Sequence, residues 1–455
     1  MRPPYTAVPV RSWRVLLATV ALLTAAAPAC TGDGDEIVIG VVGPAGGPLA
    51  EIGNASRRGA ELAAKDLNRV GGVDGKTVRI EFRDDAEAFR LPEILRDLAL
   101  GKKAAAIIGP ENLAAVATPS GPLREAETAF LSILPEGDLG PSAFRLSPSA
   151  ADQAAVLARW LVEVRRFGRI AIASADDPAG ESGARAMAAA LEAAGRDAVA
   201  VRSFPPGLPD PSAVVAGLRE SRAGALVVWA GPDDAARLLR AVRDARWDVQ
   251  VAGPLTLFDP DYRSLAGAAT DNSAFVLPRR ENWFTPELIE WFLGYSEASG
   301  VLTIPRQLTL IPALSYLDML AYDAVNVVAE AVRRAGSADA GAVRAALEDG
   351  TEVDGVFASY RFTPEDHEAF GADSLWMARL SNLAFVYDAD PRSDRETEIA
   401  FYKVQVSAYY VPQEFLRSER GRRIQRRILE QVLTDPENVS FFRPYRPPRP
   451  PPGPL

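Results

Sequence analysis

The chain has 455 residues, of which 48% are hydrophobic, and a formal net charge of −10. This length predicts two or three domains with a substantial core, and the acidic charge argues against nucleic acid as a partner. The single cysteine excludes a disulfide within the chain, and the single histidine leaves almost no material for Ser-His-Asp or His-Cys zinc chemistry.

The N-terminal segment has the pattern of a bacterial lipoprotein signal. Three arginines precede the apolar run 15–26, and small residues lead directly to Cys30. The run is shorter than the roughly 20 residues that a membrane-spanning helix needs. We therefore expect residues 1–29 to be removed, Cys30 to carry the lipid, and residues 30–35 to form a tether outside the cytoplasm. A plain secretory signal with a chance cysteine is the alternative.

From residue 36 onward, short β-rich runs alternate with segments of helical apolar spacing. Alternation on this scale predicts parallel sheets covered by helices on both faces. Two such runs, ending near 145–148 and near 275–278, indicate two α/β lobes. The expected elements are, in chain order, strand 36–42, helix 54–70, strand 77–82, strand 104–108, helix 113–126, strand 130–133, helix 152–167, strand 169–174, helix 181–194, strand 198–203, helix 211–221, strand 225–229, helix 233–245 and strand 249–252.

The rest of the chain departs from this alternation. A long helix is expected over 312–335 and a β-rich stretch over 353–410. Six arginines between Arg417 and Arg427 lie in one expected helix, which would either contact anionic lipid or an acidic partner, or simply offset an acidic body. The Pro-rich stretch 444–455 favours extended or disordered structure.

No motif for catalysis or nucleotide binding stands out. A P-loop pattern is missing, and the glycine-rich run 43–47 lacks the spacing of a pyrophosphate-binding turn. Three acidic pairs follow strands, and we interpret them as helix caps rather than catalytic carboxylates. These pairs are Asp84-Asp85, Asp176-Asp177 and Asp233-Asp234. We therefore expect no enzymatic activity, no metal and no cofactor.

Several short motifs follow one another in a recognisable order. They are Ile37-Val-Ile-Gly-Val-Val-Gly-Pro44, Gly59-Ala-Glu-Leu-Ala63, Asn68-Arg-Val-Gly-Gly-Val-Asp-Gly-Lys76, Arg83-Asp-Asp-Ala86, Ala106-Ile-Ile-Gly-Pro110, Phe144-Arg-Leu-Ser-Pro-Ser149, Ala321-Tyr-Asp-Ala-Val325, Ala342-Val-Arg-Ala-Ala-Leu347 and Asp354-Gly-Val356. This order resembles the branched-chain amino acid (Leu/Ile/Val-type) solute-binding proteins of ABC transporters, which have the type I periplasmic-binding fold.

The resemblance implies two doubly wound parallel-sheet α/β lobes that close on a ligand about a three-segment hinge. The hinge segments would lie near 145–148, 275–278 and 351–355. The implied organisation is an N-terminal lobe of 36–147 plus 278–352, a C-terminal lobe of 148–277 plus 353–410, and a basic helix with a Pro-rich tail over 411–455.

The implied ligand contacts follow the carboxyl ends of the strands, where open parallel sheets bind ligands. Matched position by position, they are Ile52, Asn112, Leu113, Glu136, Ala179, Trp229 and Leu255. Three of them depart from the family pattern, since Glu136 stands near the usual Thr, Ala179 at the usual Tyr and Leu255 near the usual acidic residue. Trp229 stands where an aromatic residue is often found, and a position in the core is its alternative role.

These departures predict a ligand other than plain leucine, isoleucine or valine. Asn112 or Leu113 stands nearest the Ser that holds the ligand carboxylate in the family, and Glu136 adds negative charge where donors would be needed. A polar or cationic molecule, or one with an apolar part resting on Trp229, fits better. The alternative is that the acidic residue lies in solvent at the rim.

The resemblance implies an extracytoplasmic, lipid-anchored solute-binding protein of an ABC importer that binds an amino acid or a related small molecule. Its expected partners are ABC permease subunits and, through the lipid on Cys30, the membrane. The alternative is a ligand-sensing receptor-type protein that signals to a membrane partner without transport, because the Arg-rich and Pro-rich tail exceeds what a transport binder needs.

Overall fold

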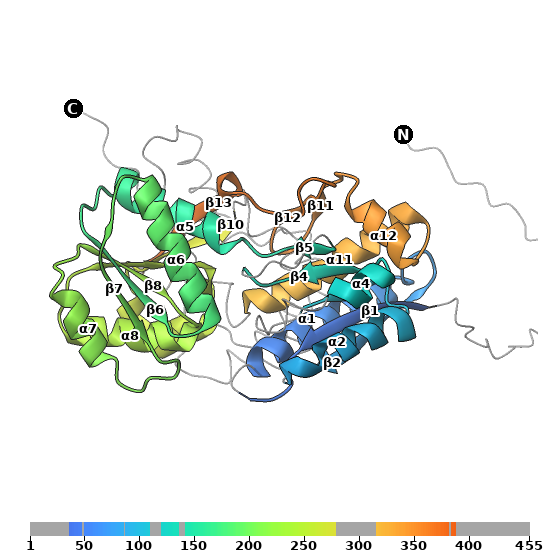
Figure 1. Ribbon diagram of the computed structural model, residues 1–455, viewed down its shortest axis with the longest axis horizontal. Coiled ribbons are helices and arrows are strands. Elements are labelled where there is room, and N and C mark those ends of the chain that lie inside the picture. The colour runs from blue at the N-terminus through green and yellow to red at the C-terminus, as the bar shows by residue number, and fades with distance from the viewer. Residues whose placement is uncertain are drawn as a thin grey trace, which may run out of the picture. The chain divides into compact units, whose positions relative to one another are not determined.

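A computed structural model of the chain describes residues 36–47, 50–85, 87–109, 120–135, 142–278, 315–381 and 384–387. Within these residues the chain forms two α/β lobes, each built on its own sheet (Figure 1). The sheets have five and seven strands, and a separate two-stranded ribbon accompanies them.

The first sheet is entirely parallel, with its strands in the spatial order β2-β1-β3-β4-β5. Its side chains alternate between two core clusters, so that Val41 and Ile108 belong to one while Val42 and Ile107 belong to the other. This alternation is the period of two that a strand imposes, and it shows that both faces of the sheet are covered. The strands are β1 (Glu36–Gly43), β2 (Thr77–Asp84), β3 (Ala106–Ile108), β4 (Ala129–Ser132) and β5 (Ala143–Arg145).

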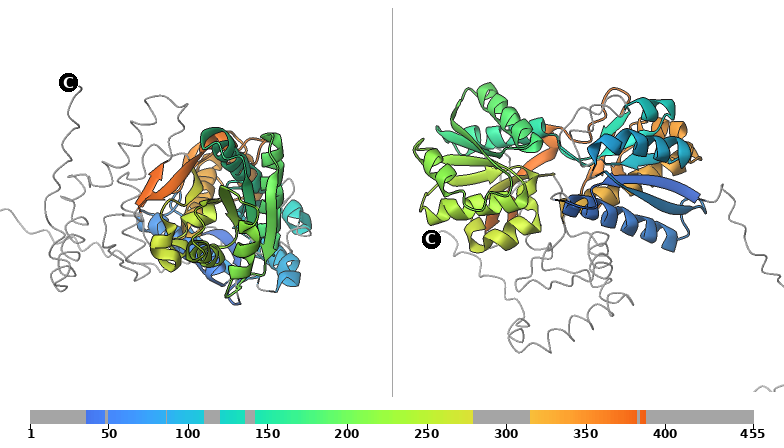
Figure 2. Two further views of the ribbon diagram at one scale, coloured as in Figure 1. Left: turned by 90° about the vertical axis from the view of Figure 1, so that its left-hand side faces the viewer. Right: turned by 60° about the horizontal axis from the view of Figure 1, so that its bottom comes forward.

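Helices from distant parts of the chain cover the two faces of this sheet (Figure 2). One face carries α1 (Ala50–Arg69), α11 (Tyr316–Ala335) and α12 (Ala340–Leu347); the other carries α2 (Leu91–Arg96) and α4 (Ser120–Glu125). A 3-10 turn (Ala88–Arg90) leads into α2 and a π-type turn (Asp97–Gly101) follows it.

Helices α1 and α11 meet at a very close approach. A Cβ on Gly59 would overlap the backbone of Asp318, so only glycine fits there. Beside it, Arg58 donates from Nε and Nη2 to the two carboxylate oxygens of the buried Asp318, at 3.2 and 3.3 Å. The pair joins the start of the first lobe to the helix that returns to it late in the chain.

The second sheet has the order β14-β13-β10-β9-β8-β6-β7, in which β6 to β10 run parallel, β13 runs antiparallel to β10, and β14 runs antiparallel to β13. Every residue of β6, β8, β9 and β10 is buried, as expected for strands covered on both faces. The strands are β6 (Ile170–Ala175), β7 (Ala198–Phe204), β8 (Ala225–Trp229), β9 (Gln250–Gly253), β10 (Ala274–Pro278), β13 (Leu375–Ser381) and β14 (Ala384–Tyr387). The helices around them are α5 (Ala150–Arg159) with a π-type turn (Trp160–Val164), α6 (Pro178–Ala193), α7 (Ser212–Arg219), α8 (Pro232–Asp244), η4 (Leu255–Phe258), α9 (Pro260–Ala266) and η5 (Gly267–Thr270).

The ribbon of β11 (Val353–Asp354) and β12 (Ser359–Tyr360) is pinned to the first lobe by Asp323 of α11. The Asp323 carboxylate, which is completely buried, accepts hydrogen bonds from the backbone N–H groups of Val356 (2.6 Å) and Phe357 (2.8 Å) and from the Tyr360 hydroxyl (2.7 Å). A buried carboxylate needs such donors, and here they come from a single turn of chain.

The expected fold class, two doubly wound parallel-sheet lobes of the type I periplasmic-binding kind, is confirmed by this architecture. Among the elements that were not anticipated, β5 has only three residues and α2 only six with a proline among them. Both are too short for a hydrophobic period to reveal. No helix in the described ranges is long and apolar enough to cross a membrane.

The third passage between the lobes runs past the end of β5 before the chain enters the second sheet. Tyr360 bonds to α11, and the ring of His367 bonds to Ala143 of β5, so the chain from 353 to 367 accompanies the first lobe. The chain joins the second sheet only at Leu375. The crossover therefore comprises residues 367–375, along which the chain leaves the end of β5 and reaches β13.

Candidate functional site

The carboxyl end of β8 carries Trp229, whose indole packs under helix α6. The side chain is only 4% exposed, and a Cβ on Gly183 of α6 would overlap its ring. Gly183 is therefore required for the indole to lie where it does. In this conformation Trp229 belongs to the core of the second lobe, which is the alternative role considered for it, and its contact with a ligand stays a prediction.

Ala179 lies in the first turn of α6, directly after the carboxyl end of β6. Asp177 caps this helix, because its carboxylate accepts the backbone N–H of Gly180 at 2.7 Å. Gly180 allows the turn to rest on the strand end, since a Cβ there would overlap the Ala175 carbonyl. The half-buried Ala179 thus stands at a strand end, as predicted, without the bulk of an aromatic ring.

Leu255 begins the short helix η4 after β9 and is 2% exposed. Its backbone N–H donates to Oε1 of the buried Gln153 at 2.8 Å, and Nε2 of Gln153 donates to the Pro148 carbonyl at 2.8 Å. Thr256 donates its hydroxyl to the carbonyl of Ala230 at 3.1 Å. The turns after β8 and β9 are therefore tied to each other and to the first crossover.

The first lobe contributes fewer described residues to the candidate site. Ile52, in the first turn of α1, is half-buried against the core, and its carbonyl accepts the Ser56 hydroxyl at 3.0 Å. At the end of β1, the Ala45 N–H donates to Asp84 at 2.9 Å. Asn112, Leu113 and Glu136, like Cys30, lie outside the described residues.

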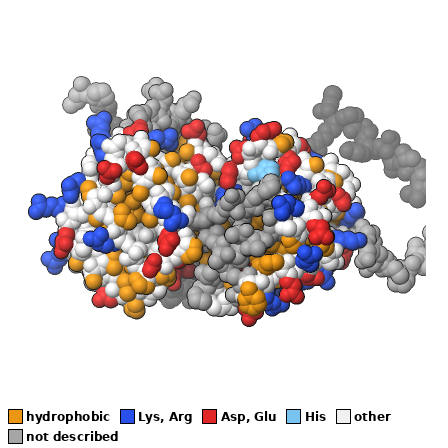
Figure 3. Space-filling model, in the orientation of Figure 1, with side chains coloured by type: hydrophobic (Ala, Val, Ile, Leu, Met, Phe, Trp, Pro, Cys, Tyr) orange, Lys and Arg blue, Asp and Glu red, His pale blue; other side chains and the backbone are white. Residues whose placement is uncertain are grey.

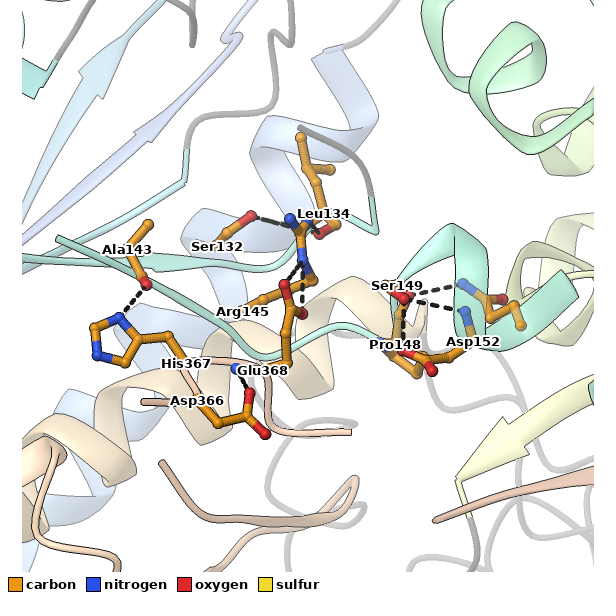
Figure 4. Close-up of polar contacts among 11 residues, drawn as sticks. Ser132, Leu134, Ala143, Arg145, Pro148, Ser149, Asp152, Asp366, His367 and Glu368 are labelled. Atoms are coloured by element: carbon orange, nitrogen blue, oxygen red, sulfur yellow. Dashed lines mark hydrogen bonds and ion pairs between the residues drawn. The ribbon is translucent and has the colours of Figure 1, made fainter. Parts of the chain in front are cut away.

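The turn after β4, residues 133–135, is held by the first crossover (Figure 4). Nη1 of Arg145 donates to the Leu134 carbonyl at 2.9 Å, and Nε lies 3.0 and 2.8 Å from the carboxylate oxygens of Glu368. Ser149 caps α5 by accepting the Asp152 N–H at 3.1 Å. A charged network therefore adjoins the turn from which the loop bearing Glu136 continues.

Acidic groups near the strand ends serve mainly as structural acceptors. Of the three acidic pairs, Asp177 caps a helix as expected, whereas Asp84 and Asp234 accept backbone N–H groups of loops, and the N-cap residue of α8 is Gly231. The described residues hold no group of three His, Cys, Asp or Glu side chains placed to bind a metal. On the face drawn in Figure 3, acidic and basic side chains are interspersed, without a large patch of either sign.

Asp259, at the start of α9, is the acid most changed by its surroundings. Burial raises the pKa of its carboxyl from the ordinary 3.8 to about 6, even though the Asp261 N–H and the Ser315 hydroxyl both donate to it. Arg263, on the same short helix, has its pKa lowered to about 10 by burial, while the charge of Asp259 works in the opposite direction. Desolvation therefore outweighs pairing for both groups.

Sequence reasoning missed the roles of Gln153, Arg145 and Glu368. The run from Phe144 to Ser149 is one of the motifs that resemble the family. Within it, the only local sign of a special role for Arg145 is that a charged residue stands at the end of a buried strand. The partners of Arg145 and Gln153 lie 223 and 102 positions away, so no local pattern could reveal them.

Comparisons with known proteins show which family and fold this chain resembles. A family described as periplasmic binding protein matches residues 36–383. The Leu/Ile/Val-binding protein homolog 3 of Brucella melitensis is 28% identical over 332 residues, which cover 70% of this chain and 85% of that protein. The leucine-, isoleucine-, valine-, threonine- and alanine-binding protein of Pseudomonas aeruginosa is 25% identical over 329 residues, covering 70% and 83%.

Solved structures of low sequence identity share the fold. A branched chain amino acid ABC transporter protein of Thermus thermophilus, with bound valine, has a TM-score of 0.68 and 16% identity, covering 81% of this chain and 99% of that one. The substrate binding protein LivJ of Streptococcus pneumoniae, in complex with isoleucine, has a TM-score of 0.64 and 20% identity, covering 78% and 100%. The resemblance seen in the sequence motifs is thereby confirmed, and the chain belongs to the periplasmic binding protein family.

Proposed function

We propose that this protein is an extracytoplasmic solute-binding protein of an ABC importer, which binds an amino acid or a related small molecule between its lobes. The observation that carries the proposal is the family match over residues 36–383, on a chain whose two sheets are followed at several strand ends by candidate ligand residues. The relatives are binding proteins by name, which supports a protein without turnover.

The proposed ligand site combines the strand-end residues of both lobes. In the second lobe it comprises Ala179, Leu255 and the end of β8 at Trp229; in the first lobe it comprises Ile52 and the loops that carry Asn112, Leu113 and Glu136. Ala179 has a much smaller side chain than the tyrosine usual at this position, which favours a ligand larger or differently shaped than valine. Glu136 favours a polar or cationic group over an unpaired carboxylate.

Anchoring through a lipid on Cys30 would keep the protein beside its permease subunits. The charged start, apolar run and small residues of positions 1–29 support this part of the proposal. A sensing protein without transport would need the same anchor, so the anchor does not separate these two functions. Loss of uptake in a strain that lacks the protein, with uptake of other solutes intact, would favour transport.

The ligand itself is best sought by mass spectrometry of the protein purified under native conditions and then unfolded. We expect a small molecule of the amino acid or polyamine class to be released in an amount comparable with the protein. A refolded, ligand-free sample that binds back the released molecule would support the proposal. A folded protein that releases nothing and binds no member of these classes would contradict it.

A further inference from the structure

We propose that Arg145 is a positioning residue that couples the turn after β4, residues 133–135, to the first and third crossovers. Movement of the lobes about these crossovers would then shift the turn from which the loop bearing Glu136 continues. The inference rests on the proposed binding function, because it assigns a mechanical role to a part of the proposed ligand site.

The main chain of Arg145 already joins the two crossovers. Its N–H donates to the carbonyl of His367 at 2.8 Å, and its own carbonyl accepts the N–H of Ala369 at 3.0 Å. This pairing lays residues 367–369 along β5 as a short parallel bridge. Because the two backbones are hydrogen-bonded to each other, a change of backbone direction at one crossover must also move the other.

The side chain of Arg145 extends this link to the turn after β4. The guanidinium is largely buried, with only 11% of the side chain exposed, and it reaches the Leu134 carbonyl on one side and the Glu368 carboxylate on the other. These acceptors belong to different segments, and a planar group with several N–H donors can satisfy both at once. A lysine ammonium at the end of a flexible stem would hold this geometry less well.

Two further hydrogen bonds tie this region to the chain that follows β5. The N–H of Leu146 donates to the carbonyl of Ser132, the last residue of β4, at 2.8 Å, and the N–H of Ala150 donates to the Pro135 carbonyl in the turn at 3.1 Å. Ala150 is the first residue of α5, whose remaining length packs on α6 and β13 of the second lobe. The turn is thus held by residues that lead directly into the second lobe.

Glu368 is also held in place by contacts other than its ion pair with Arg145. Its N–H donates to the carboxylate of Asp366 at 3.0 Å. Its neighbour His367, the only histidine of the chain, stacks on Phe144 with ring centroids 4.1 Å apart and bonds through Nδ1 to the Ala143 carbonyl at 3.0 Å. The carboxylate therefore approaches the guanidinium from a segment fixed against β5, as Figure 4 shows.

The test compares Arg145→Met with Arg58→Met in the full chain. Arg58 also pairs with a carboxylate through two nitrogens, but this pair joins α1 to α11 within the first lobe, so the variant controls for loss of stability. Affinity for the small molecule released from the natively purified protein is measured by calorimetry. Amide hydrogen exchange of the ligand-free proteins is followed in peptides covering 130–135 and 366–369.

We expect Arg145→Met to weaken binding about tenfold and to speed exchange in both peptides, because a charge-assisted hydrogen bond at a largely buried site is lost. Arg58→Met should change affinity less than about twofold at a similar loss of stability. Arg145→Lys and Glu368→Gln should weaken binding by about threefold, and they keep the test decisive if Arg145→Met does not fold.

Equal losses of affinity in the Arg145 and Arg58 variants, or unchanged exchange over 130–135 in Arg145→Met, would overturn the coupling. A wild-type protein that binds no amino acid or polyamine would instead overturn the proposed function. The exchange measurement needs no ligand, so the two failures are distinguishable.

Discussion

Removing the charge of Asp323 should destabilise the first lobe strongly. The substitution Asp323→Asn keeps the shape of the side chain but replaces one carboxylate oxygen with an amide nitrogen. In the native protein, both oxygens accept from donors, the backbone N–H groups of Val356 and Phe357 and the Tyr360 hydroxyl. In the variant, the amide NH2 group therefore points at one or more of these N–H or O–H donors, which then lose their acceptor.

The magnitude follows from these three contacts. Hydrogen bonds to a charged group contribute about 1.5–3 kcal/mol each, and a buried donor left unpaired costs about 1–3 kcal/mol. Against this, the neutral amide avoids the desolvation cost of a buried charge, so we expect a net loss of about 3 kcal/mol. Tyr360→Phe removes only one of these donors and should cost about 2 kcal/mol.

Urea unfolding followed by circular dichroism provides the assay. Because the two lobes need not unfold in a single step, the transition that shifts in Tyr360→Phe identifies the first lobe. We expect Asp323→Asn to shift the same transition further. A loss below about 1 kcal/mol for Asp323→Asn would refute the reasoning, because the three contacts could not then be contributing as the geometry requires.

Three other substitutions test separate parts of the structure. Asp259→Asn should remove a pH dependence of the free energy of unfolding. The native carboxyl keeps its proton up to about pH 6, whereas the unfolded carboxyl releases it near pH 3.8. The wild-type protein should therefore lose about 2–3 kcal/mol of stability as pH rises through that window. Parallel stability curves of wild type and variant from about pH 4 to pH 7 would contradict this. Gly183→Ala should cost about 1–3 kcal/mol by displacing the Trp229 ring, measurable as a lower melting temperature and an altered near-ultraviolet spectrum; an unchanged melting temperature would place the indole elsewhere. Cys30→Ser should abolish incorporation of a fatty-acid probe, and equal labelling would exclude lipidation at this residue.

The central strands of the fold could be predicted from sequence almost residue by residue. The strand expected over 225–229 is β8 as observed, because a short β-rich run buried on both faces leaves little freedom in where it begins and ends. Helix α1 was expected over 54–70 and occupies Ala50–Arg69. Its end was signalled by two glycines, whereas its start lacks any polar side chain typical of a cap.

The site was predictable only as a set of strand ends. That Ala179, Trp229 and Leu255 follow β6, β8 and β9 could be read from the order of elements. That Trp229 lies under α6 depends on Gly183, which is 46 positions away by residue number and carries no signal of its own. The role of Arg145 likewise depends on Glu368, which the third crossover brings to it from 223 positions away.

The most direct test of the central claim is calorimetric titration of the refolded, ligand-free protein with a panel of amino acids, polyamines and aromatic acids. The proposed function predicts saturable one-to-one binding of at least one panel member with micromolar or tighter affinity, and the residues near the first-lobe loops predict that leucine, isoleucine and valine bind more weakly than it. Tight binding of leucine or valine would contradict the assignment of Glu136 to the site. Absence of binding across the whole panel, by a protein that circular dichroism shows to be folded, would contradict the function itself.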